Sequence, residues 1–303
     1  MYKQELYQTI RENVNLLSDN HSSDYPYIPL YDKQLPSSDC MSVILDKIRA
    51  TMFPGYFGNP LVNINSLQYH TGVNLEQIYK LLSEQIFHAL SFENENINSQ
   101  ELKENASVHT IAFINKLPEI KRMLSTDVKA MFNSDPAAKS YGEIIFCYPA
   151  IKAILNYRIA HELYTLGIPL IPRIISEQAH SETGIDIHPR AQIGEYFCID
   201  HGTGIVIGGT SIIGNNVMLY QGVTLGAKNF TLDEEGHPID IPRHPIIEDN
   251  VTIYSNSSIL GRITIGKGTI VGGNIWLTNS VPPYSKILQS KAVELSFSDG
   301  LGI

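Results

Sequence analysis

Residues 246–277 read IIEDNVTIYSNSSILGRITIGKGTIVGGNIWL, and an aliphatic side chain returns at every sixth position of this stretch. The same period occurs upstream, and the three series are Ile187, Ile193, Ile199 and Ile205; Ile207, Ile213, Leu219 and Leu225; and Ile247, Ile253, Ile259, Ile265, Val271 and Leu277. A helix repeats every 3.6 residues and a strand every two, so neither presents a period of six on one face. The period predicts a parallel β-helix, in which three hexads close one coil and stacked coils bury an apolar column.

Two segments interrupt the hexads. The first is DHGTG at 200–204, where the phase of the repeat shifts by two residues. The second spans the nineteen residues 226–244 and ends in the motif PRHP at 242–245. One interpretation is a structural solenoid without any chemistry. A long loop that leaves a regular coil and closes on an arginine and a histidine instead favours a functional site.

The part of the chain before the hexads has the periodicity of helices. Helices are predicted at 1–17, 40–52, 75–90 with Asn74 as N-cap, 99–117, 118–132 and 148–164. The predicted fold class is therefore α+β. An N-terminal all-α domain covers residues 1–183, the β-helix covers 184–285, and 286–303 form a C-terminal tail.

Composition and charge argue against several classes of function. The 303-residue chain is 43% hydrophobic and 17% charged, as expected of a folded globular protein. Its net charge is −9 and it has no cluster of Lys and Arg, so we expect neither nucleic acid nor an anionic membrane as partner. The N-terminus has no apolar signal-peptide core, no apolar run is long enough to span a membrane, and the three cysteines are scattered. These features predict a cytoplasmic protein.

The first interruption contains a candidate general base. The turn at Gly184 precedes Gly202 by eighteen residues, the length of one coil, so Asp186 is expected to stack near His201. A carboxylate beside an imidazole fixes its tautomer and raises its basicity, as a general base requires. The alternative is two unrelated side chains on the surface of the solenoid.

Two further charged residues are candidates for substrate binding. Arg243, held between prolines, is placed to form a bidentate pair with a carboxylate. Asp135 precedes a proline and is either a plain turn former or a ligand for an amine. We expect no metal site, because compact ligand spacing is lacking among His188, His201, His237 and His244.

Six motifs occur in a characteristic order. They are DPAA at 135–138, YRIAH at 157–161, DIHP at 186–189, IDHGTGIVIG at 199–208, QGVTLG at 221–226 and RHP at 243–245. Together they resemble the serine O-acetyltransferases, a family of hexapeptide-repeat acyltransferases, over about residues 125–285. The resemblance implies a left-handed β-helix assembled as a homotrimer or hexamer. It also implies acetyl transfer from acetyl-CoA to the hydroxyl of L-serine, which gives O-acetylserine for cysteine biosynthesis.

The motifs carry implied roles with them. The implied catalytic residues are His201, as general base, and Asp186, which orients it. The implied serine ligands are Asp135, Asp200, Arg243 and His244. The implied acetyl-CoA ligands are Gly226, Ala227 and Ser255, with the co-substrate lying along the solenoid between subunits. The end of the chain, Ile303, resembles the tail that docks into O-acetylserine sulfhydrylase, a candidate partner.

Some residues depart from the family pattern, and other functions stay open. The family usually has Gly at Ala227, Glu at Gly209, a Gly- and Ala-rich coil at 254–257 and a small residue at Trp276. The main alternative is a hexapeptide acetyltransferase for another hydroxyl acceptor, such as a sugar. A γ-carbonic-anhydrase-like metalloenzyme and a non-catalytic scaffold that regulates a partner are further alternatives.

Overall fold

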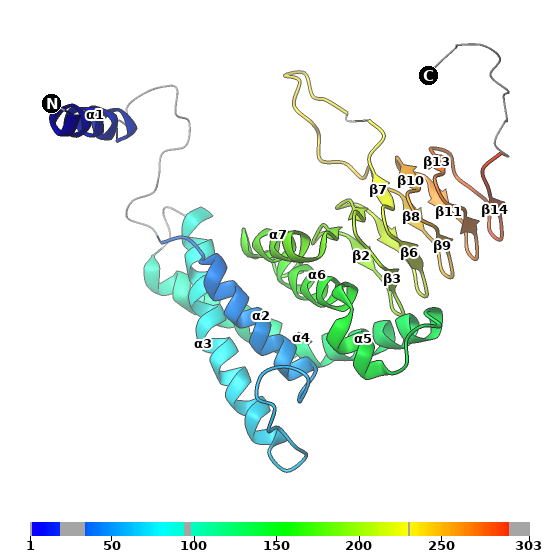
Figure 1. The fold of residues 1–303 in the computed structure, drawn as a ribbon, viewed down its shortest axis with the longest axis horizontal. Coiled ribbons are helices and arrows are strands. Elements are labelled where there is room, and N and C mark those ends of the chain that lie inside the picture. The colour runs from blue at the N-terminus through cyan, green and yellow to red at the C-terminus, as the bar shows by residue number, and fades with distance from the viewer. Residues whose placement is uncertain (1, 19–33, 94–97, 230, 291–303) are drawn as a thin grey trace. The chain divides into compact units, whose positions relative to one another are not determined.

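The computed structural model describes residues 2–18, 34–93, 98–229 and 231–290, and the chain divides into two compact units (Figure 1). Residues 1–35 form the first unit, which contains α1 (Tyr2–Leu17). The apolar stripe of this helix is exposed and consists of Leu6, Ile10, Val14 and Leu17. Residues 36–303 form the second unit, which contains the remaining elements.

Among the described residues, six helices open the second unit. They are α2 (Ser38–Met52), α3 (Leu67–Glu93), α4 (Ser99–Ser134), α5 (Tyr141–Cys147), α6 (Pro149–Thr165) and α7 (Ile171–Thr183). The helices predicted at 40–52 and 148–164 are confirmed as α2 and α6. None of the helices that the structure describes has the length and apolar character needed to cross a membrane.

Two predicted helix boundaries are wrong. Residues 99–117 and 118–132 form one helix, α4, which continues through Pro118. Proline removes one helical hydrogen bond, but the helix is held by a single apolar stripe of Phe113, Leu117, Ile120 and Leu124, all buried. Asn74 lies inside α3 rather than at its start. The helix begins earlier because the side chain of Asn63 accepts hydrogen bonds from the N–H groups of residues 65 and 66 and forms the turn there.

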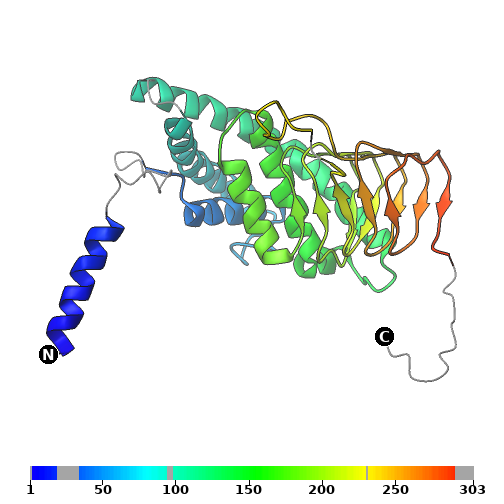
Figure 2. The same cartoon turned by 90° about the horizontal axis from the view of Figure 1, so that it is seen from above.

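The rest of the unit is a parallel β-solenoid of about five coils, which confirms the predicted fold class (Figure 2). The first sheet contains β1 (Asp186–Ile187), β4 (Val206–Ile207), β7 (Thr224–Gly226), β10 (Ser258–Leu260) and β13 (Trp276–Leu277). The second contains β2 (Gln192–Ile193), β5 (Ile212–Ile213), β8 (Ile246–Ile247) and β11 (Thr264–Ile265). The third contains β3 (Cys198–Asp200), β6 (Met218–Tyr220), β9 (Thr252–Ile253), β12 (Ile270–Val271) and β14 (Lys286–Ile287).

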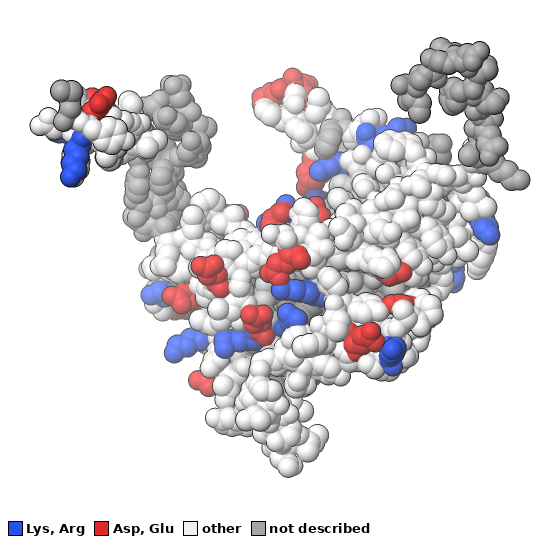
Figure 3. Space-filling model, viewed as in Figure 1, with Lys and Arg blue, Asp and Glu red and all other residues white. Residues whose placement is uncertain are grey.

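The hexad residues form the core of this solenoid, as predicted. Every aliphatic residue of the three series is buried except Leu277 in the last coil, which is half-buried. Full burial of one such side chain contributes about 1.5–3 kcal/mol, so the period of six fixes which face of each strand points inward. The outward face visible in Figure 3 is largely uncharged over the solenoid, while most of the charged side chains lie over the helices.

The first coil is two residues longer than the regular coil of eighteen residues that follows it. Asp186 pairs with Val206, a separation of twenty residues, whereas Val206 pairs with Thr224, a separation of eighteen. The eighteen-residue register expected between Gly184 and Gly202 is therefore wrong. The two extra residues lie between β3 and β4, in a segment that we call the His201 corner, residues 200–206.

The backbone of the His201 corner requires glycine. His201, Gly202 and Gly204 have φ angles of 58°, 92° and 80°. A Cβ atom on Gly202 would lie 2.6 Å from Cδ1 of Ile185, so this position accepts neither the conformation nor the volume of another residue. The tight turn at Gly202 pushes His201 outward, and its side chain is 72% exposed.

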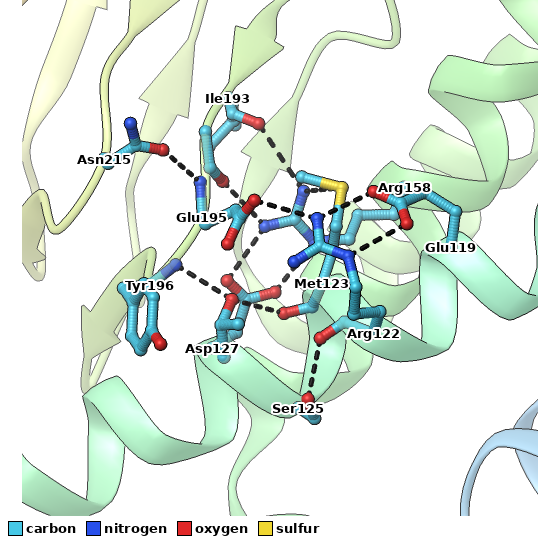
Figure 4. A network of polar contacts seen from close by, with 12 residues as sticks. Glu119, Arg122, Met123, Ser125, Asp127, Arg158, Ile193, Glu195, Tyr196 and Asn215 are labelled. Atoms are coloured by element: carbon cyan, nitrogen blue, oxygen red, sulfur yellow. Dashed lines mark hydrogen bonds and ion pairs between the residues drawn. The ribbon is translucent and has the colours of Figure 1, made fainter.

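A buried ion pair joins the helices to the first coil (Figure 4). Arg158 of α6 donates from Nε and an Nη atom to the carboxylate of Asp127 in α4, at 2.7 and 2.8 Å. The same guanidinium donates to the carbonyl of Gly194, and Asp127 accepts from the N–H of Phe197. Both partners therefore satisfy backbone groups at the open end of the solenoid, and this junction fixes α4 against β3.

Candidate active site

Four polar side chains gather around the His201 corner. Asp200 and His201 belong to the corner itself, while Asp135 follows α4 and Tyr148 follows α5. His201 Nε2 lies 3.8 Å from an Asp200 oxygen, within ion-pair range but too far for a hydrogen bond. The hydrogen bond from Tyr148 is the main reason why the pKa of the Asp135 carboxyl is lowered, and His201 is close enough to add to this shift. The structure thus brings together three of the predicted site residues and adds a tyrosine.

Asp135 is held in place by its own turn. It is the C-cap of α4, its Oδ1 accepts the N–H of Ala137 at 2.8 Å, and its other oxygen accepts the hydroxyl of Tyr148. The Tyr148 hydrogen bond, followed by that of Ala137, lowers the pKa of Asp135. The same hydrogen bond raises the pKa of Tyr148 to about 12, which keeps the phenol a donor at neutral pH. The turn therefore presents a fixed carboxylate beside His201.

A second group of predicted residues lines a cavity of about 490 Å³ on the first sheet, which we call the arginine pocket. Its lining consists of Tyr164, Arg173, Asp186, His188, Arg190, Val206, Ile207, Gly208, Gly209, Thr210, Asp240, Arg243 and His244. Three guanidinium groups and two imidazoles face two carboxylates here, so the pocket suits an anionic ligand.

His244 has a defined hydrogen-bonding state in this pocket. Its Nδ1 accepts the N–H of Thr210 at 3.1 Å, and the Thr210 hydroxyl lies 2.7 Å from the same atom. Burial, and then the nearby Arg243, lower the pKa of His244 to about 4. The ring is therefore neutral near pH 7 and carries its proton on Nε2, which makes it a donor rather than a base.

The long loop is tied to the rim of the pocket. An Nη atom of Arg190 donates to both carboxylate oxygens of Asp240 at 2.7 Å. Arg243 lies 3.8 Å from the same carboxylate. The hydrogen bond to Arg190 is the main reason why the pKa of Asp240 is lowered. The loop predicted to be functional thus contributes Asp240, Arg243 and His244 to one pocket.

The structure divides the predicted site residues between two edges of the first sheet. Asp135, Asp200 and His201 lie at the edge shared with the third sheet, and Ser255 follows β9 at that same edge. Arg243 and His244 lie at the edge shared with the second sheet, where Gly226 ends β7 and Ala227 follows it. Asp186 begins β1 and lines the arginine pocket, and it forms no hydrogen bond or ion pair with His201 in the described part of the chain.

Sequence reasoning missed several residues of the two groups. Tyr148, Thr210 and Arg262 each contact a predicted residue, and Arg190 contacts Asp240, which was missed as well. Their partners lie thirteen to fifty residues away in the sequence, so no local motif predicts these contacts. A partial signal existed only for Thr210, a polar residue directly after two glycines at the corner that follows β4. In the part of the chain that the structure describes, no three His, Cys, Asp or Glu side chains are grouped to bind a metal ion.

Comparison with known proteins gives consistent matches. The chain is 47% identical over 298 residues to the plasmid serine acetyltransferase of Synechococcus elongatus, which covers 96% of this chain and 93% of that protein. The structure of Entamoeba histolytica serine acetyltransferase 1 in complex with L-cysteine covers 85% of this chain and 88% of its own, with a TM-score of 0.71 and 36% identity. A serine acetyltransferase in complex with CoA covers 81% and 95%, with a TM-score of 0.52 and 27% identity. A comparison with models of protein families finds no match.

The solenoid of hexads and its likeness to these proteins define an acyltransferase of the hexapeptide-repeat class. The identity to the Synechococcus protein extends over nearly the whole chain. The chain belongs to the serine acetyltransferase family, so the predicted family and enzyme class are confirmed.

Proposed function

We propose that this chain transfers the acetyl group of acetyl-CoA to the hydroxyl of L-serine, giving O-acetyl-L-serine and CoA, for cysteine biosynthesis. The observation that carries the proposal is the 47% identity, over 96% of the chain, to a serine acetyltransferase. The chemistry of the two residue groups agrees with this substrate. Serine is a zwitterion, and its ammonium, carboxylate and hydroxyl need a carboxylate, a guanidinium and a base, respectively.

His201 is the proposed general base. Its exposed imidazole takes the proton of the serine hydroxyl while the oxygen attacks the thioester carbonyl. The tetrahedral intermediate then collapses, the C–S bond breaks, and the proton passes from the imidazolium to the departing thiolate of CoA. Asp186 begins the strand next to β4 and is proposed to orient the ring, whose exposed position leaves room to turn toward it.

Serine itself is proposed to bind between two carboxylates and the arginine pocket. Asp135 and Asp200, at the His201 corner, take the ammonium and position the hydroxyl near the base. Arg243 pairs with the carboxylate of serine, and the Nε2–H of His244 donates a further hydrogen bond to it. The lowered pKa of Asp135 agrees with its role as an anion, and the lowered pKa of His244 agrees with its role as a neutral donor.

The separation of the two groups supports a site built from two copies of the chain. The chain advances by four residue steps through β4 from Gly204 at one edge of the first sheet to Gly208 at the other, a distance of about 13 Å at about 3.3 Å per residue. A single serine is too short to span it. We therefore propose that the His201 corner of one subunit faces the arginine pocket of the next. A head-to-tail contact that closes on itself forms a ring of subunits, and a homotrimer is the ring that we propose.

Acetyl-CoA is proposed to lie in the same junction between subunits. Gly226 and Ala227 lie at the pocket edge, and Ser255 at the corner edge, so a ligand between two copies reaches both. No metal is needed for this chemistry, because the base and the hydrogen-bond donors are side chains. Ile303, the residue predicted to bind O-acetylserine sulfhydrylase, lies outside the described residues, and that partnership stays a prediction together with the cytoplasmic location and the hexamer.

The proposal is tested by acceptor-dependent release of CoA from acetyl-CoA. L-Serine is compared with ethanolamine, which keeps the amine and hydroxyl but lacks the carboxylate, and with a panel of sugar hydroxyls. We expect wild type to prefer L-serine strongly, and Arg243→Ala to lose most of the preference for serine over ethanolamine. A preferred sugar acceptor would replace this function by the alternative one. An unchanged preference in Arg243→Ala would reject the contact between Arg243 and the serine carboxylate, but not the transfer of acetyl to serine.

A further inference from the structure

Thr210, in the corner that follows β4, binds both residues that close the arginine pocket. Its hydroxyl oxygen accepts the backbone N–H groups of Arg243 at 2.9 Å and of His244 at 3.0 Å. The same hydroxyl lies 2.7 Å from Nδ1 of His244, and the backbone N–H of Thr210 donates to this Nδ1 at 3.1 Å. One threonine thus forms four hydrogen bonds with two consecutive residues from the end of the long loop.

These contacts leave a single arrangement of protons. Both lone pairs of the Thr210 hydroxyl are used by backbone N–H donors, so its proton goes to Nδ1 of His244. The backbone N–H of Thr210 is also only a donor. Nδ1 therefore carries no proton, and the neutral ring has its proton on Nε2.

The Nε2 end of the His244 ring also has a fixed position. A Cβ atom on Gly208 would lie 2.2 Å from Nε2 of His244, so the imidazole occupies the space that a side chain at Gly208 would need. Both residues line the arginine pocket. Only glycine at position 208 leaves room for the ring, and the Nε2 end of the ring therefore lies over Gly208 in the lining of the pocket.

A residue of the next coil contacts the backbones of both Thr210 and His244. Arg262, which follows β10, donates from one Nη atom to the carbonyl of Thr210 at 2.7 Å and to that of His244 at 2.9 Å. The two backbones are therefore held at a fixed distance by a guanidinium that is itself outside the pocket. Such support lets a side chain keep one orientation before any ligand arrives.

We propose that Thr210 is a positioning residue that fixes His244 as the Nε2–H tautomer, so that His244 donates a hydrogen bond to the acceptor substrate and is unable to take its proton. The inference rests on the proposed function in that the acceptor is serine. It assigns the two histidines different tasks: His201 is left as the base, and His244 serves as a fixed donor.

The matched variants are Thr210→Val, which removes the hydroxyl but keeps the shape, and Thr210→Ser, which restores the hydroxyl. Thr252→Val is the control, because Thr252 lies on β9 of another sheet, away from the pocket, and valine is well suited to a strand. Each full-length protein is labelled with 15N-histidine, and the His244 signals are assigned by their loss in His244→Asn. The KM for serine and kcat are measured in parallel.

We expect wild type, Thr210→Ser and Thr252→Val to show one His244 tautomer, protonated on Nε2. Thr210→Val should show a mixture of tautomers and a KM for serine raised by about tenfold, the scale of one well-placed hydrogen bond, with kcat changed much less. Protonation on Nδ1 in wild type would overturn the inference. So would a change in only one of the two readouts in Thr210→Val, or no change in either. If wild type shows the tautomer but serine releases no CoA, the proposed function fails while the proton assignment survives.

Discussion

The pair Asp127–Arg158 offers a sharp test of how the helical region is fixed to the solenoid. The side chains are 0% and 4% exposed, and each also hydrogen-bonds to backbone groups of the first coil. Asp127→Asn keeps the size of the side chain and an oxygen for the N–H of Phe197, but it leaves the guanidinium of Arg158 buried without its counter-charge.

The expected loss of stability is large. Removing one partner of a buried ion pair costs about 3–5 kcal/mol, because the remaining charge is not solvated. A typical domain has a total stability of about 5–15 kcal/mol, so the substitution takes away a major part of it. Urea unfolding of wild type and Asp127→Asn, followed by circular dichroism and extrapolated to zero urea, measures the difference.

The same junction supplies its own control. Glu195 forms an ion pair with Arg122 at 2.8 Å, also between the first coil and α4, but in contact with solvent (Figure 4). Arg122 additionally pairs with Glu119, so Glu195→Gln should leave the unfolding midpoint unchanged. If Asp127→Asn lowers the free energy of unfolding by less than about 1 kcal/mol, or by no more than Glu195→Gln does, burial is not the reason why this pair stabilises the protein.

Three further predictions concern the His201 corner. His201→Ala should lower kcat by about 10²- to 10⁴-fold in the CoA-release assay while circular dichroism stays native, and near-normal kcat would reject the base assignment. Tyr148→Phe should raise the pKa of Asp135 toward its ordinary value, so the carboxylate protonates at a higher pH and the acid limb of kcat/KM for serine moves upward; an unmoved limb would contradict this. Gly202→Ala should lose more than about 1 kcal/mol in urea unfolding, because positive φ and a steric clash act together. Gly236→Ala has positive φ but no atom within 4 Å of the added Cβ, so it should cost less, and equal losses would remove the steric part of the argument.

The solenoid was predictable because one local signal repeats along the whole of it. Each hexad places one aliphatic residue inward, and the error at any single turn is corrected by the next coil. The helices gave weaker signals. Pro118 indicates a break when considered alone, yet the buried stripe on both sides of it keeps α4 intact. Asn74 fits an N-cap pattern, but the turn built by Asn63 starts the helix earlier. In both cases a contact outside the local window decided the outcome.

The site was predictable as a set of residue types but not as a geometry. The motif DHGTG contains two extra residues, and a count of eighteen per coil cannot detect them without knowing which glycines adopt positive φ. The supporting residues are harder still to find. Thr210 and Arg262 act through backbone groups of residues 210, 243 and 244, and such contacts depend on how three coils stack.

The separation of the base from the carboxylate-binding residues follows from the same stacking. Each coil has three corners, and residues from one corner stay at that corner in every coil, since strands pair in parallel and in register. The loop that provides Arg243 connects β7 to β8, and this position fixes it to the corner between the first and second sheets. His201 lies between β3 and β4, which fixes it to the corner between the third and first sheets. No conformational change that preserves the coil moves one corner to the other, and for this reason we propose that a serine that touches both lies between two chains. A variant trapped as a folded monomer should therefore lack activity even with every site residue present, and mixing His201→Ala subunits with Arg243→Ala subunits should restore part of it. Absence of such complementation in mixed trimers would place the whole site within one chain.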